Sequence, residues 1–247
     1  MKMNKTAAAI TAGIITFGAM ASASAAGIGF VNSGALLQAH PKMEKVQLDM
    51  RTAAQKAQEN FNSRSAGKSD QEKEQIAQEI QRDMAAKERT AMQPILQDIR
   101  KATGYLQQEL GEPKGKKIVI LSRTNYEYGA VVFGTMMAGA VIVTLNQGKT
   151  WAELEYELGM VEPDLIFNDG IDYGYRAQLE ALYGARLRPM DAWTAAPEAE
   201  MVNRIDHEGL LMLMFTSGTT GRSKGVMLAE RNFFTVMQMH VAMGDHL

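Results

Sequence analysis

The sequence predicts an α/β fold in which an incomplete parallel sheet with covering helices is preceded by an α-helical hairpin. The sheet is indicated by short, continuously apolar runs, such as residues 118–121 and 140–145, that alternate with helical segments. This is the pattern of parallel strands that are buried on both faces. The hairpin is indicated by two long polar segments before residue 103 in which apolar residues recur every three or four positions.

Composition excludes several classes of function. A chain of 247 residues allows one or two domains, and 46% hydrophobic residues is typical of globular proteins. The chain has no cysteine, which excludes disulfides and thiolate metal sites. The net charge of −2 comes without a dense basic stretch, so nucleic acid is not expected as a partner. The histidines show no helical ligand spacing and are expected to be surface or packing residues: His40, His207, His240 and His246.

Residues 1–26 have the three-part layout of a secretory signal peptide. Lys2 and Lys5 form a charged start, residues 6–20 are apolar, and residues 21–26 are all alanine or serine. The alternative is a membrane anchor, which is disfavoured because the apolar part is shorter than the ~20 residues that a span needs. We therefore expect cleavage near residue 26 and export to the periplasm or cell envelope.

Residues 27–103 are predicted to form a short strand and an antiparallel helical hairpin. The strand, residues 27–32, begins like a dinucleotide-binding fingerprint but lacks its third glycine, so that function is discarded. Ser69 and Glu72 have the spacing of a capping box that would start the second helix. Two helices with narrow apolar stripes bury little by themselves, so the pair is either a solvated hairpin without site chemistry or part of an assembly. The stripes contain Met43, Val46, Met50, Ala53, Ala57 and Phe61, then Ile76, Ile80, Met84, Ile95 and Ile99.

Residues 104–247 are predicted to alternate strands with helices. Gly111 should end a first helix. Ligands of parallel sheets bind beyond the carboxyl ends of the strands, which places the candidate site in the loop from Thr216 to Gly225. Strands are expected at 118–121, 140–145, 165–167 and 210–215, and helices at 126–138, at 151–158, where Gly159 should end the helix, and at 175–182.

The chemistry of this loop suits a polyphosphate. Glycines let the backbone approach phosphate oxygens closely, hydroxyls and N–H groups donate hydrogen bonds, and a lysine supplies a mobile charge. It is not a Walker A loop, because Ser223 stands where that pattern needs glycine. The plain alternative is a Gly/Thr/Ser turn that joins two strands. The candidate phosphate-binding residues are Thr216, Ser217, Gly218, Thr219, Thr220, Gly221 and Lys224.

The string from Leu213 to Val226 closely resembles the phosphate-binding signature of the adenylate-forming (AMP-binding) acyl-CoA synthetases, and residues 222–228 resemble the long-chain members. Residues 114–121, 133–146 and 163–167 resemble the same family in order and spacing. The resemblance implies ATP with Mg²⁺ as cofactors, and a carboxylic acid, such as a fatty acid, and coenzyme A as partners. It implies that the candidate residues hold the β- and γ-phosphates. It assigns no catalytic residue and no protein ligand for Mg²⁺ to this chain.

The signal, the strand and the hairpin together resemble the OmpH/Skp family of periplasmic chaperones, and residues 94–102 resemble that family's returning helix. This resemblance implies an exported holdase whose partners are unfolded outer-membrane proteins, or self-assembly through the hairpin. It is the alternative to the ligase function.

Neither resemblance extends over a complete family member. The later synthetase elements, among them the magnesium-binding segment and the domain with the catalytic lysine, find no match before Leu247. We therefore expect residues 104–247 to be a truncated AMP-binding domain, inactive as this chain. A ligase of this family is expected in the cytoplasm, where ATP is, which conflicts with an export signal. The hypothesis is a join of two unrelated genes near residues 100–105, either a genuine fusion or an error of sequence assembly.

Overall fold

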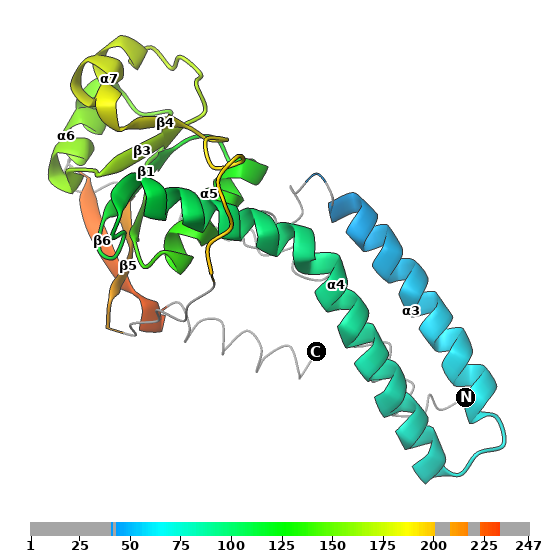
Figure 1. Cartoon of the computed structure of the whole chain (residues 1–247). Helices are drawn as coiled ribbons and strands as arrows, with labels where there is room; N and C mark the ends of the chain where they lie inside the picture. The colour runs from blue at the N-terminus through cyan, green and yellow to red at the C-terminus, as the bar shows by residue number, and fades with distance from the viewer. Residues whose placement is uncertain (1–40, 42, 201–207, 217–222, 233–247) are drawn as a thin grey trace. The chain divides into compact units, whose positions relative to one another are not determined.

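The computed structural model describes residues 41, 43–200, 208–216 and 223–232, and it divides into two units, residues 1–96 and 97–247 (Figure 1). The predicted signal peptide and the predicted strand at residues 27–32 lie outside the described residues. The division falls between Leu96 and Gln97, whereas the sequence predicts a boundary between Thr103 and Gly104. None of the described helices has an apolar stretch long enough to cross a membrane.

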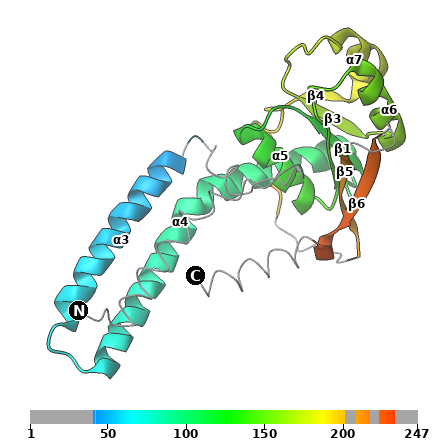
Figure 2. The same ribbon diagram turned by 180° about the vertical axis from the view of Figure 1, so that it is seen from behind.

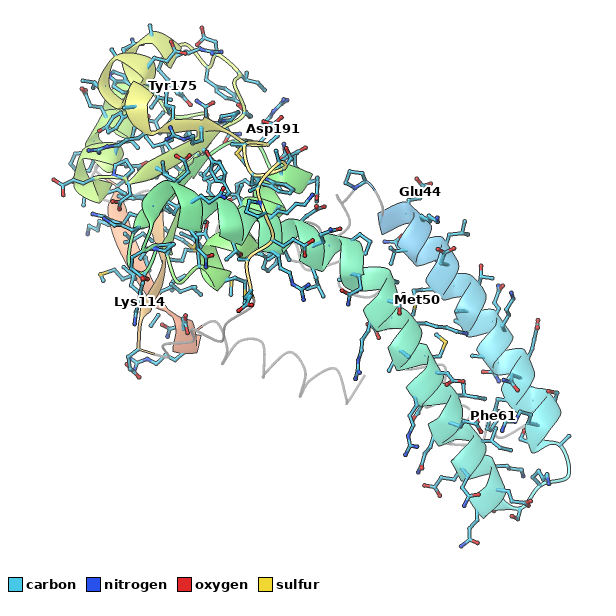
Figure 3. The ribbon with its side chains drawn as sticks, in the orientation of Figure 1. Glu44, Met50, Phe61, Lys114, Tyr175 and Asp191 are labelled. Atoms are coloured by element: carbon cyan, nitrogen blue, oxygen red, sulfur yellow. The ribbon has the colours of Figure 1, made fainter. Side chains whose placement is uncertain are left out.

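The first unit contains helix α3 (Met43–Ser65) and the beginning of helix α4 (Asp70–Leu110). The two helices run side by side (Figures 1 and 2), and Phe61 of α3 lies between them (Figure 3). The exposed side chains of Arg64 and Glu79 form an ion pair of 2.6 Å across the pair. The predicted capping box is present, because the Ser69 N–H donates to Glu72 Oε2 at 2.9 Å. The apolar stripes meet in one cluster of Ala57, Phe61, Ile76, Ala77 and Ile80, with Met84 against it.

The second unit is built on a six-stranded sheet in the order β4-β3-β1-β2-β5-β6. All neighbouring pairs are parallel except the last, in which β5 and β6 are antiparallel. β6 and β4 therefore form the two edges of the described sheet. The strands are β1 (Lys117–Leu121), β2 (Val141–Thr144), β3 (Leu165–Asn168), β4 (Leu187–Pro189), β5 (Leu210–Thr216) and β6 (Lys224–Ala229).

Helices cover both faces of the sheet. Val119 and Ile166 pack on one face with α6 (Trp151–Val161) and α7 (Arg176–Tyr183), which is followed by a 3₁₀ turn at Gly184–Arg186. The alternate strand residues face the part of α4 after Gln97, where the ring of Tyr105 contacts that of Phe167 at 6.0 Å between centroids. Helix α5 (Tyr126–Met137) packs on that same part of α4. The sheet with covering helices is therefore confirmed.

Helix α6 runs past the end predicted for it at Gly159 and stops at Val161. Its capping residue, Glu162, has a φ of 50°. Proline disfavours the α conformation in the residue before it, and Pro163 follows Glu162, so the stop comes from proline rather than from glycine. Gly111 does end α4, with a φ of 68°.

The loop predicted from Thr216 to Gly225 is shorter than expected, because Lys224 and Gly225 already belong to β6. β6 was not predicted from the sequence. Its apolar residues Val226 to Leu228 pair with β5, and this pairing extends the strand back to Lys224. The loop thus joins two strands, as the plain-turn alternative also required.

Candidate functional site

The loops that follow β1, β2, β3 and β5 all leave the sheet at the carboxyl ends of its parallel strands, because these four strands are parallel. The chain after β1 enters α5 on one face, whereas the chains after β2 and β3 enter α6 and α7 on the other. The connection after β1 therefore runs to the opposite face of the sheet from the connections after its two neighbours, β2 and β3. Such switch points are where open α/β sheets bind their ligands.

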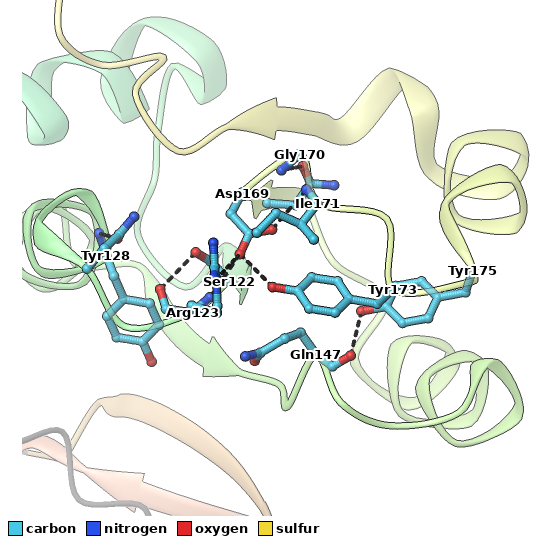
Figure 4. A network of polar contacts seen from close by, with 11 residues as sticks. Ser122, Arg123, Tyr128, Gln147, Asp169, Gly170, Ile171, Tyr173 and Tyr175 are labelled. Atoms are coloured by element: carbon cyan, nitrogen blue, oxygen red, sulfur yellow. Dashed lines mark hydrogen bonds and ion pairs between the residues drawn. The ribbon is translucent and has the colours of Figure 1, made fainter.

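A polar network centred on Asp169 lies at the carboxyl ends of these strands (Figure 4). The Arg123 N–H, from the β1–α5 loop, donates to Asp169 Oδ2 at 3.1 Å, and the Arg123 side chain approaches the same oxygen at 3.7 Å. The Tyr173 hydroxyl donates to it at 2.8 Å, and the Ile171 N–H donates to Oδ1 at 3.1 Å. The β1–α5 and β3–α7 loops are thereby tied together by one carboxylate.

These contacts set the ionisation of Asp169. Burial by itself would raise the pKa of this carboxyl group, since its side chain is only 9% exposed. The hydrogen bonds from Arg123, Tyr173 and Ile171, with the charge of Arg123, outweigh burial and hold the pKa below its usual value. Asp169 is therefore charged at neutral pH and acts as an acceptor that fixes the two loops.

Aromatic rings continue the network toward β2. Tyr173 stacks on Tyr175 at 6.1 Å between centroids, and Tyr175 lies 6.3 Å from Trp151 of α6. The buried Tyr175 hydroxyl donates to the carbonyl oxygen of Gln147, in the β2–α6 loop, at 3.0 Å. Burial first, and then the neighbouring Tyr173 and Asp169, raise the pKa of Tyr175 to about 12, so its hydroxyl stays protonated as a donor.

Two of the predicted phosphate-binding residues are described, and the structure brings them together. Thr216 ends β5, Lys224 begins β6, and the two are paired across the antiparallel ladder. Both residues are exposed, and the Thr216 hydroxyl lies 3.5 Å from the carbonyl oxygen of Lys224. A hydroxyl and an ammonium group at adjacent strand ends fit phosphate oxygens. Ser217, Gly218, Thr219, Thr220 and Gly221 lie outside the described residues.

Sequence reasoning missed the Asp169 network. One signal was available, because residues 168–174 read Asn-Asp-Gly-Ile-Asp-Tyr-Gly directly after a strand, and such a run marks a tightly turned loop. The partners Arg123 and Gln147 carry no local signal. Within the described parts of the chain, no group of three or more acidic or histidine side chains could hold a metal ion.

Known proteins are similar to this region in sequence and in fold. The family model for AMP-binding enzymes matches residues 86–246. This range includes residues 94–102, which resemble the returning helix of the OmpH/Skp family. The 4-coumarate–CoA ligase-like 2 of Arabidopsis thaliana is 29% identical over 159 residues, 54% of this chain and 27% of that protein. The peroxisomal OPC-8:0-CoA ligase 1 of the same plant is 26% identical over 145 residues, 53% of this chain and 26% of that protein.

Solved structures are also similar to this chain in fold. ATP-bound MatB from Rhodopseudomonas palustris is 27% identical, with a TM-score of 0.51 over 57% of this chain and 29% of that one. The o-succinylbenzoate CoA synthetase MenE of Bacillus subtilis, at 22% identity and a TM-score of 0.52, shares the fold. The chain spans less than a third of the length of these relatives. Because the family model covers most of its residues, this chain belongs to the AMP-binding enzyme family.

Proposed function

We propose that this chain carries the phosphate-binding part of an ATP-dependent acid–thiol ligase, with residues 104–247 as part of an AMP-binding domain. The observation that carries the proposal is the pairing of Thr216 with Lys224 at the carboxyl end of β5, within the region that the family model matches. The structure of MatB from Rhodopseudomonas palustris contains bound ATP, which supports a nucleotide as the ligand. Ser217, Gly218, Thr219, Thr220 and Gly221, between the two paired residues, complete the proposed phosphate site.

The proposed reaction has two steps. A carboxylate oxygen attacks the α-phosphorus of ATP and the α–β phosphoanhydride bond breaks. Pyrophosphate is released, and the acyl-adenylate is formed. The thiol of coenzyme A then takes the acyl group, and AMP leaves. The ammonium group of Lys224 would neutralise charge on the departing pyrophosphate, and the Thr216 hydroxyl would orient it. Mg²⁺ bound with the nucleotide would supply further neutralisation. The acid is proposed by class only, with fatty and aromatic acids as the first to assay, and the proposed compartment is the cytoplasm.

Lys224→Ala is expected to weaken ATP binding by roughly tenfold to a hundredfold, because a charge-assisted hydrogen bond contributes about 1.5–3 kcal/mol. Isothermal titration calorimetry of the whole chain with MgATP measures this. The matched control is Lys87→Ala, which removes an exposed lysine in the first unit and should leave the affinity unchanged. Equal affinities of Lys224→Ala and wild type, or no binding by wild type, would contradict the proposal.

A second candidate function rests on the first unit. We propose, as the alternative, that residues 27–103 act as an OmpH/Skp-like holdase that is exported by residues 1–26. The packing of α3 on α4 through the Phe61 cluster supports a helical arm, and the exposed surface of α3 is mostly polar, with Leu48 as an exposed apolar side chain. Such an arm would hold unfolded outer-membrane proteins or a second copy of the chain.

The holdase proposal predicts that the chain, at equimolar concentration, suppresses aggregation of a urea-unfolded outer-membrane barrel protein on dilution. Light scattering follows the aggregation. The Phe61→Ala variant, which loosens the helical pair, should protect less, and an unrelated protein at the same concentration should not protect at all. Scattering that is equal with and without the chain would end this proposal and leave the ligase proposal standing.

A further inference from the structure

The β2–α6 loop, residues 145–150, begins next to Thr216, the first residue of the candidate phosphate site. β2 is the parallel neighbour of β5, with Thr144 opposite Met214. Asn146 and Thr216 each stand two residues beyond this pair, so the two connections leave the sheet next to each other. The position of the β2–α6 loop therefore limits the space beside Thr216.

Contacts within the loop give it one conformation. Asn146 Oδ1 accepts a hydrogen bond from the Gly148 N–H at 2.8 Å. Thr150 caps α6 in a reciprocal capping box, in which its N–H donates to Glu153 Oε2 at 2.9 Å. These bonds fix the conformation of the loop, but they do not attach its middle residues to the neighbouring helices.

Two side chains from outside attach the loop. The Tyr175 hydroxyl holds the Gln147 carbonyl at 3.0 Å. Glu157, on the buried face of α6, forms an ion pair with the Lys149 ammonium group through Oε1. The side chain of Glu157 is 0% exposed and that of Lys149 is 20% exposed. The loop is thus fixed at Gln147 and at Lys149, by Tyr175, which precedes α7, and by Glu157 of α6.

The buried ion pair is poorly suited to a purely stabilising role. Glu157 Oε2 accepts no hydrogen bond from any residue that the structure describes. A buried pair with an unsatisfied oxygen costs desolvation energy, and replacing such pairs by apolar residues of similar size often leaves stability unchanged or increases it. An apolar pair would also pack with the neighbouring Leu154 and Leu158. What an apolar pair would lack is directional attachment of the loop.

We propose that Glu157 and Tyr175 are positioning residues that hold the β2–α6 loop against the phosphate site and thereby set the affinity for the nucleotide. This inference rests on the proposed function, because the ligand whose binding it concerns is ATP. Neither residue touches the nucleotide. Each acts through the loop, Glu157 through Lys149 and Tyr175 through Gln147.

The test separates loop position from stability. In the double variant Lys149→Met/Glu157→Leu of the whole chain, the unfolding midpoint should stay at or above the wild-type value, since no charge is left buried. Hydrogen exchange of the amides of residues 146–150 should become faster, and MgATP affinity should fall about threefold to tenfold. Tyr175→Phe keeps the ring stack and should weaken MgATP binding by a similar factor. Lys149→Arg keeps the ion pair and should bind as wild type does.

Each outcome decides one proposal. If wild type binds MgATP, and the double variant and Tyr175→Phe bind it equally well, the positioning role is wrong while the proposed function stands. If exchange in residues 146–150 is unchanged, the attachment itself is wrong. If wild type does not bind MgATP while Lys224 is intact, the proposed function fails, and the inference falls with it.

Discussion

Gly104→Ala is expected to lower the free energy of unfolding of the second unit by about 3 kcal/mol. A Cβ atom at Gly104 would lie 2.1 Å from the carbonyl oxygen of Pro197 and 3.3 Å from the amide nitrogen of Ala199, both of which are backbone atoms. Backbone cannot rotate away as a flexible side chain can. The intrinsic preference of helices for alanine over glycine, about 1 kcal/mol, is too small to offset the displacement.

Urea unfolding followed by tryptophan fluorescence measures this effect. Both tryptophans of the chain, Trp151 and Trp193, lie in the second unit, so their emission reports its unfolding. The matched control is Gly159→Ala in α6, where a Cβ atom meets nothing within 4 Å. It should be neutral or stabilising by up to about 1 kcal/mol. Equal midpoints for the two variants would show that residues 197–199 do not lie against α4.

The Gly104 contact bears on the proposed join near residues 100–105. The backbone N–H of Ala199 donates to the carbonyl of Arg100 at 3.1 Å, and Ala102 lies against the position of Gly134 in α5. Thr103 and Leu106 are 2% and 1% exposed. These residues are packed into the second unit, and the family match begins before them, at residue 86. A join of unrelated segments is therefore easier to accommodate before residue 86 than at residues 100–105.

Local signals account for the parts of the fold that the sequence predicted. Strands β1, β2, β3 and β5 are apolar runs whose neighbours in the chain are turn residues, and a buried parallel strand needs nothing more. Caps such as Ser69 with Glu72, or Gly111, act within a few residues of one another. The candidate phosphate loop stays a prediction, which the sequence allows because its residue types follow one another along the chain.

Contacts between distant residues account for what was missed. β4 has only three residues, one of them proline, and it forms because it pairs with β3. β6 includes Lys224 and Gly225 because β5 pairs with them. The Tyr175 hydroxyl and the Gln147 carbonyl are 28 positions apart, and nothing in either local sequence points to the other. The sequence marks the loop that contains Asp169 as tightly turned, but the contact between Asp169 and Arg123 could not be predicted, since it depends on strand order, which places β3 next to β1.

Lys149→Met by itself is expected to destabilise the second unit by about 3–5 kcal/mol, because it leaves the carboxylate of Glu157 buried without its cation. Adding Glu157→Leu should restore the whole of this loss, so the double-mutant cycle should show strong coupling between the two positions. Tryptophan fluorescence during urea unfolding measures all four corners of the cycle.

An exposed ion pair of the same unit provides the comparison for Lys149→Met. Lys116, with a side chain that is 46% exposed, lies 3.2 Å from Asp164, and Lys116→Met should cost less than about 1 kcal/mol because solvent screens such pairs. The two lysines differ in what their removal leaves behind, since Asp164 stays partly solvated, whereas Glu157 has no exposed surface. A similar small cost for both variants would mean that water reaches Glu157. The β2–α6 loop would then be open to solvent, and the ion pair could not hold it against the phosphate site.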